Sequence, residues 1–143
     1  MNKLFPNFKS TFLIVGFTFI FLALSLFSKG LMLSMAQFKV PEEILSSAHY
    51  ADALQWVYIH MITLGILIVC IGFSVSERTK QKWIALILFL ISSFYTYLDF
   101  RTSDSALGNA LYKGESSVAP AFISLLVSIL FLQLSIRLFL SKK

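Results

Sequence analysis

The stretch ALQWVYIHMITLGILIVCIGF, residues 53–73, decides the fold of this chain, because it is apolar along nearly its whole length. A helix needs about 20 residues to cross the ~30 Å of hydrocarbon in a bilayer. The stretch is continuous rather than alternating, and open sheets leave backbone groups unpaired in lipid, which disfavours a strand. We therefore predict a transmembrane helix here.

Three similar runs lie on either side, at Thr11–Phe27, Trp83–Tyr97 and Val118–Phe139. Hydrophobic residues make up 57% of the chain and charged residues only 13%, which is outside the usual range of soluble domains. We predict an all-α membrane protein, a four-transmembrane-helix bundle that forms one domain over residues 1–143. The predicted helices are residues 10–34, 41–75, 81–103 and 117–140. Cleavage after Ser34-Met35-Ala36, which would make the first run a secretory signal, is the alternative to a retained first helix.

The positive charge of the chain predicts its orientation rather than a nucleic-acid partner. If all four helices span, eight of the twelve basic residues fall on one side of the membrane: Lys3, Lys9, Arg78, Lys80, Lys82, Arg137, Lys142 and Lys143. Positively charged segments stay preferentially on the cytoplasmic side. We therefore expect a multi-pass protein of the plasma membrane, with both termini on the cytoplasmic side. The expected location is the bacterial inner membrane.

The second predicted helix carries polar and amphipathic side chains along one face. At about 100° per residue, the five fall within an arc of roughly 80°: His49, Asp52, Trp56, His60 and Thr63. The third helix has a similar line, formed by Ser92, Tyr95, Thr96 and Asp99. Two such alignments are not expected from randomly scattered polar residues.

The short turn at Ser76–Gln81 predicts an antiparallel hairpin in which these two faces meet. Folding about position 78 brings His60 within about one helical turn of both Asp99 and Tyr95. Ionisable groups inside a membrane generally face the bundle interior or water. We therefore predict one outward-facing polar site, formed by His60, Asp99, Asp52, Tyr95, Arg101 and His49.

Each of these residues also has a simpler structural interpretation. His60 can be a packing histidine hydrogen-bonded to Tyr95 or Asp99, a proton-relay or solute-contact group, or a ligand of haem or a metal. Asp52 and Asp99 can be solvated carboxylates at helix ends, and His49 can be a solvated helix residue. Arg101 can be an interfacial anchor or the partner of an aspartate.

Small residues in the predicted spans indicate close helix packing. The first span has Thr11, Thr18 and Ser25 on one side, and the fourth has Ser117, Ser124, Ser128 and Ser135. Gly65 and Gly72, seven residues apart, mark a close contact of the second helix. Small and hydroxyl residues let membrane helices approach and hydrogen-bond. Cys70 is the only cysteine, so the chain has no internal disulfide.

The sequence contains no HExxH motif, glycine-rich phosphate loop or cysteine pair. His49 and His60 share one helix about 16 Å apart, so one chain cannot sandwich a haem between them, although a dimer could. Catalytic residues and cofactors stay unassigned, and no metal site is predicted.

Three functions fit these patterns. The first is binding or passage of a small solute, ion or proton at the polar site between the second and third helices, in a homo-oligomer. The second is an accessory or assembly subunit of a larger membrane complex. The third is an intramembrane enzyme or haem protein.

Overall fold

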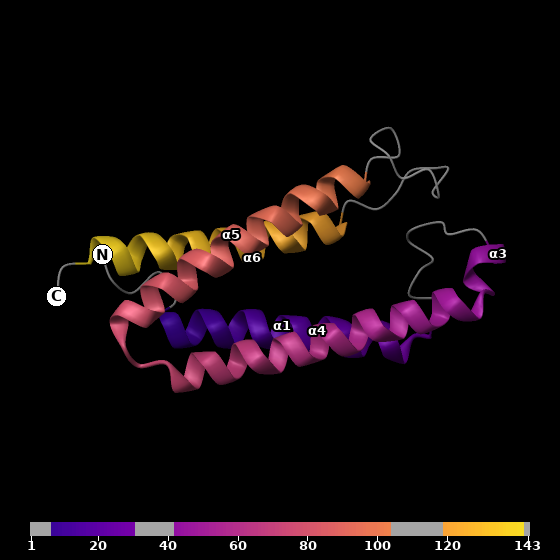
Figure 1. The fold of residues 1–143 in the computed structure, drawn as a ribbon, viewed down its shortest axis with the longest axis horizontal. Helices are drawn as coiled ribbons and strands as arrows, with labels where there is room; N and C mark the ends of the chain where they lie inside the picture. The colour runs from indigo at the N-terminus through magenta and orange to yellow at the C-terminus, as the bar shows by residue number, and fades with distance from the viewer. Residues whose placement is uncertain (1–6, 31–41, 104–118, 142–143) are drawn as a thin grey trace.

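Four long helices and one short helix make up residues 7–30, 42–103 and 119–141, the part of the chain that the computed structural model describes (Figure 1). Their bounds are α1 Phe8–Ser28, α3 Glu42–Leu45, α4 Ala48–Ser74, α5 Arg78–Ser103 and α6 Ala119–Leu140. All four long helices are long and apolar enough to cross a membrane, and the described residues contain no strand. For the described residues, the prediction of an all-helical fold with four helices long and apolar enough to span a membrane is confirmed.

The ends of the helices follow local capping chemistry. Helix α1 begins two residues earlier than expected, where the Asn7 side chain accepts a hydrogen bond of 2.8 Å from the Ser10 backbone N–H. It ends at Ser28, and Gly30 follows with a φ of 75°, a conformation that glycine adopts readily. The predicted extension to residue 34 lies outside the described residues.

The helix expected over residues 41–75 is broken, which corrects the prediction. Glu42 and Glu43 form the acidic first turn of α3, but α3 ends at Leu45. Helix α4 begins at Ala48, after Ser47 adopts an extended backbone with a ψ of 126°. Serine favours such a position at the start of a helix, because it competes with helical hydrogen bonding.

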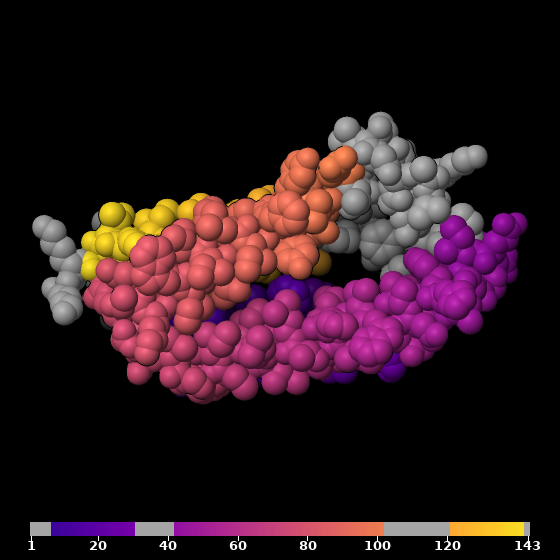
Figure 2. Space-filling model, viewed as in Figure 1, coloured from indigo at the N-terminus to yellow at the C-terminus, as the bar shows by residue number. Residues whose placement is uncertain are grey.

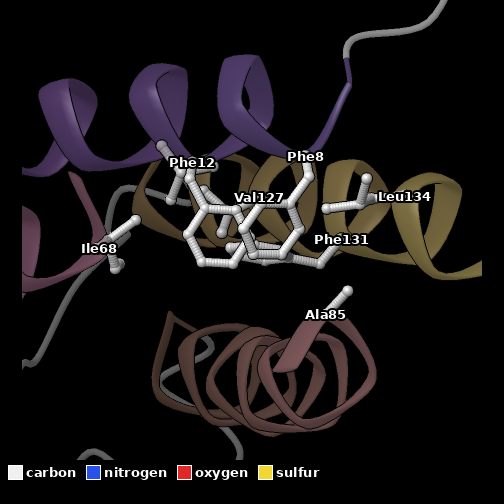
Figure 3. Packing of buried hydrophobic residues seen from close by; sticks show 8 residues of the cluster. Phe8, Phe12, Ile68, Ala85, Val127, Phe131 and Leu134 are labelled. Carbon is white, nitrogen blue, oxygen red and sulfur yellow. The ribbon is translucent and has the colours of Figure 1, made fainter. Parts of the chain in front are cut away.

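The helices pack as two antiparallel pairs, α1 with α4 and α5 with α6 (Figure 1). The start of α1, the turn between α4 and α5, and the end of α6 lie at the same end of the molecule. We call this the turn end, and the opposite end the open end. At the turn end all four helices share one core, in which Phe12 meets Phe131 edge-to-face with ring centroids 5.5 Å apart (Figure 3). Ile68 from α4 and Ala85 from α5 complete this core.

Towards the open end the two pairs diverge. The second hydrophobic cluster joins only α1, α3 and α4, around Ala23 and Tyr58. Helices α5 and α6 continue separately, with Phe100 and Phe122 edge-to-face at 5.9 Å. Figure 2 shows a hollow between α4 and α5 on this face of the molecule.

The expected hairpin packing of α4 against α5 is therefore not observed. Residues 75–77 connect the two helices, yet α4 packs along α1 and α5 packs along α6. The reason is the placement of small residues, since Gly65 of α4 lies against Gly16 of α1. A methyl group placed on either glycine would lie 2.7 Å from the backbone oxygen of the other. Such close backbone approach gives membrane helices their van der Waals contact.

Candidate functional site

The polar face of α5 meets the serines of α6 instead of α4. Ser93 and Ser128 share a hydrogen bond of 2.8 Å across the two helices. One turn or more towards the open end, the Ser124 hydroxyl donates to the half-buried carboxyl group of Asp99. The serines of the fourth span were predicted to be packing residues. Ser124 and Ser128 lie at this helix contact, as predicted, and Ser117 lies outside the described residues.

Five polar side chains are buried in the described part of the chain, and all five are hydroxyl residues on α1, α5 or α6: Thr11, Ser92, Thr96, Ser128 and Ser135. Ser92 donates to the Phe89 carbonyl at 3.1 Å, and Thr96 donates to the Ser92 carbonyl at 2.8 Å. The hydroxyl oxygens of Thr11 and Ser135 are buried without a hydrogen-bond partner. We call these five residues together with Ser93 and Ser124 the hydroxyl seam. Helix α4 contributes no residue to it.

The five polar and amphipathic residues that the sequence aligned on α4 are all exposed. We call His49, Asp52, Trp56, His60 and Thr63 the α4 polar face. It lies roughly 180° around the helix from Tyr58, Gly65 and Gly72, the buried residues of α4 nearest α1. The α4 polar face therefore points away from α1.

His60 is held by its own helix. Its Nδ1 lies 2.7 Å from the Trp56 carbonyl oxygen, and the two rings have centroids 5.7 Å apart. A carbonyl oxygen only accepts hydrogen bonds, so Nδ1 carries the proton in this contact. In the neutral imidazole, Nε2 is then the acceptor on the exposed side of α4.

The structure thus separates the residues that the sequence placed in one site. Asp99 is bonded to α6, whereas His60 is bonded to its own helix on α4. Tyr95 is 57% exposed on α5, and Arg101 is exposed near the end of the same helix. Asp52 and His49 are exposed on α4. A pocket shared by His60 and Asp99 is not assembled, because α4 and α5 do not pack along each other.

Within the described residues, neither a group of metal ligands nor the pocket at the end of α1 supplies a second candidate site. Within the described ranges no group of three or more His, Cys, Asp or Glu side chains could hold a metal ion. A shallow pocket of about 160 Å³ lies where the end of α1 meets α4, lined by Phe27, Gly30, Ala51, Leu54, Gln55 and Tyr58. Only the Gln55 amide and the Tyr58 hydroxyl supply polar side-chain groups to it.

Two contributors to the structure were missed in the sequence. Gly16 forms the other half of the Gly65 contact, and Ser93 bonds Ser128. Gly16 is a lone small residue in an apolar run. Its role in helix packing can be recognised only when α1 is aligned antiparallel to α4. Ser93 lies about 100° from Ser92 around α5, outside the narrow line of polar residues that the sequence revealed.

No protein-family model matches the chain, and no curated protein or solved structure is similar to it.

Proposed function

We propose that this chain is an accessory subunit of a larger membrane complex, and that the α4 polar face docks against another membrane-spanning protein. The observation that carries the proposal is that this face is exposed over its whole length although it belongs to a membrane-spanning helix. Lipid tails offer no hydrogen bonds, so polar groups at this depth are stabilised by protein or water.

His60 lies at a depth in the membrane where its side chain needs a hydrogen-bond partner from protein or water. It lies 14 residues from Ser74 at the turn end of α4, which is about 21 Å along a helix and within ~30 Å of hydrocarbon. Thr63 is deeper, but its hydroxyl donates to the Ile59 carbonyl at 2.9 Å. His60 keeps an acceptor, Nε2, on the exposed side. Leaving a buried acceptor without a partner costs about 1–3 kcal/mol.

The hydrogen-bonding state of His60 defines the partner. Because Nδ1 donates to the Trp56 carbonyl, a docked helix has to present a donor to Nε2, such as a hydroxyl, an amide or an indole N–H. In a two-fold pair of copies, residue i contacts residue j and j contacts i, so only residues at the axis meet their own equivalents. Two His60 side chains at such an axis would meet acceptor to acceptor, and we propose a different polypeptide as the partner.

Helix α4 also extends beyond the hydrocarbon. Asp52 and His49 lie about 33 and 38 Å along the helix from Ser74, so both pass the far boundary of a ~30 Å layer. At the aqueous surface they are free to form ion pairs or hydrogen bonds with an extramembrane segment of the partner. The proposed partner therefore has both a donor-bearing transmembrane helix and a polar segment just above it.

His60→Leu tests the proposal, because leucine fits lipid but accepts no hydrogen bond. We expect native mass spectrometry of gently extracted wild-type protein to show the 16.2 kDa chain bound to a second, larger polypeptide, and His60→Leu to lose it. His60→Gln keeps an acceptor oxygen near this level and should retain the partner.

Thr63→Val is the matched control on the same face. The Thr63 hydroxyl is already satisfied by its own helix, so its loss should leave the complex intact. Extraction of the wild type as a monomer, or as multiples of one chain, would contradict the proposed partner. Equal retention in His60→Leu would contradict the role of His60.

We further propose that the turn end faces the cytoplasm, in a bacterial inner membrane. The support is the concentration of cations at this end. The Lys9 amine lies 4.3 Å from the centre of the Phe73 ring, and the Lys82 amine lies 5.5 Å from that of Phe139. Long basic side chains at helix ends extend towards the interface in this way. Such residues are most frequent on the cytoplasmic side of membrane proteins.

A further inference from the structure

The buried hydroxyl groups follow a regular order along the helices. Four contacts give α5 and α6 one antiparallel register, in which paired residue numbers add to about 222: Ser93 with Ser128, Asp99 with Ser124, Phe100 with Phe122, and Trp83 with Phe139. In this register Thr96 and Ser92 lie at the levels of residues 126 and 130 of α6. The contact between Phe12 and Phe131 places Thr11 near the level of residue 132.

The hydroxyl groups therefore occur at successive levels, from Asp99 and Ser124 down to Ser135. Neighbouring levels differ by two or three residues of α6, which is about 3–4.5 Å along the helix axis. The whole series covers 11 residues, or about 16 Å, roughly half of a ~30 Å hydrocarbon layer. Packing of small residues explains the contacts at Ser93 and Ser128. It does not explain why the series continues to two hydroxyls that have no partner.

Thr11 and Ser135 are these two hydroxyl residues. Their side chains are 0% and 4% exposed, and neither hydroxyl oxygen has a hydrogen-bond partner. Buried polar groups in proteins are nearly always hydrogen-bonded, to protein or to ordered water. These two hydroxyls thus lie at the deep end of the seam with unused donors and acceptors.

We propose that the hydroxyl seam is a proton-access path that leads from the Asp99 carboxyl group at the open end to Thr11 and Ser135. A hydroxyl group has one donor and two acceptor positions, so each member of the seam is able both to donate and to accept a hydrogen bond. A hydroxyl oxygen can accept a proton from one neighbour while its own proton moves to the next, directly or through a single water molecule. Each hydroxyl is unchanged after the transfer, and the Asp99 carboxylate is the group that stores the proton.

The core closes this path at the turn end. Phe8 is 5% exposed and Leu134 is 2% exposed, and both belong to the shared core (Figure 3). In the register given above they lie near the levels of Thr11 and Ser135. The buried Phe131 and Val127 pack beside the seam, so it suits a proton better than a hydrated ion. The wild-type path is therefore open on one side only.

Removing the closing side chain tests the path. Phe8→Ala should raise proton leakage several-fold in proteoliposomes that contain a pH-sensitive dye, without a matching leak of potassium ions. Tyr58→Ala is the matched control, because it truncates a buried aromatic side chain in the α1–α4 cluster, away from the seam. Adding Asp99→Asn or Ser128→Ala to Phe8→Ala should abolish the extra leak. Equal leakage in Phe8→Ala and Tyr58→Ala, or a leak that survives both additions, would overturn the proposal.

If Phe8→Ala does not fold, a second measurement on proteins that retain Phe8 still tests the proton path. The infrared carboxyl band that appears on acidification and disappears in Asp99→Asn identifies the protonated Asp99. In the proposed path, Thr11 and Ser135 communicate with Asp99 through the seam hydroxyls and single water molecules, so Thr11→Val and Ser135→Ala should shift this band. A purely structural seam would leave the band in place while lowering thermal stability, and that result would contradict the proton path.

Discussion

At the residue scale, the close backbone approach of Gly16 and Gly65 gives the sharpest prediction on stability. A methyl group on Gly65 would lie 2.7 Å from the Gly16 oxygen and 2.7 Å from the Ile20 side chain. Because a backbone oxygen cannot move aside alone, we expect Gly65→Ala to separate α1 from α4 and to destabilise the fold by about 1–3 kcal/mol. The measurement is the unfolding midpoint in detergent. Ser74→Ala, at an exposed position of the same helix, should leave that midpoint unchanged, and an equally small effect of Gly65→Ala would refute the close contact.

The roles of single residues were only partly predictable from the sequence. Gly65, Gly72, Ser124 and Ser128 were correctly identified as positions of close packing. His60 and Asp99 were correctly placed on aligned polar faces, but not with the right neighbours. Helical periodicity gives the direction of a side chain around its own helix. It does not say which other helix lies in that direction.

At the scale of elements, the connection between two helices did not decide their packing. The sequence predicted an α4–α5 hairpin because the turn is short, and the structure has such a turn, closed by the Gln81 amide on the Val75 carbonyl at 2.8 Å. Beyond the turn the helices separate. Since lipid is as apolar as leucine, helices in a membrane pair where small residues and hydrogen bonds allow close contact. On α5 those residues face α6, and on α4 they face α1.

Paired cysteines distinguish the two arrangements. In a Cys70→Ala background, Ser93→Cys with Ser128→Cys should form an intramolecular disulfide, because the two hydroxyl oxygens are 2.8 Å apart. The measurement is the loss of two hydrogens from the mass of the oxidised chain. His60→Cys with Asp99→Cys is the matched pair that an α4–α5 hairpin would bring together, and it should stay reduced. The opposite result would restore the hairpin.

At the scale of the whole molecule, two helix pairs share one core at the turn end and diverge towards the open end (Figure 1). The number and approximate limits of the spans were predictable, because a helix that crosses a bilayer needs about 20 consecutive apolar residues, and such runs are visible in the sequence. The divergence was not predictable, since it depends on which pairs form. It leaves the α4 polar face on the outside of the molecule, and the hydroxyl seam inside the α5–α6 pair and its contact with α1.

The same arrangement makes the orientation in the membrane testable. The turn end carries Arg78, whose guanidinium donates to the carbonyl and hydroxyl oxygens of Ser141, and Lys80, whose amine lies 2.7 Å from the Glu77 carboxylate. Translocating this cluster is more costly than translocating the fewer cations between the other helix ends. The loop between α5 and α6 should therefore face outward, together with the projecting end of α4.

Thiol labelling on intact cells measures this directly. In a Cys70→Ser background, Asn109→Cys in the α5–α6 loop should react with a membrane-impermeant maleimide added outside, whereas Thr79→Cys at the turn end should not. Both should react after the membrane is permeabilised, which controls for accessibility. If Thr79→Cys alone were labelled in intact cells, the protein would have the opposite orientation in the membrane. The end of α4 with His49 and Asp52 would then face the cytoplasm, and the polar segment of the proposed partner would lie on that side.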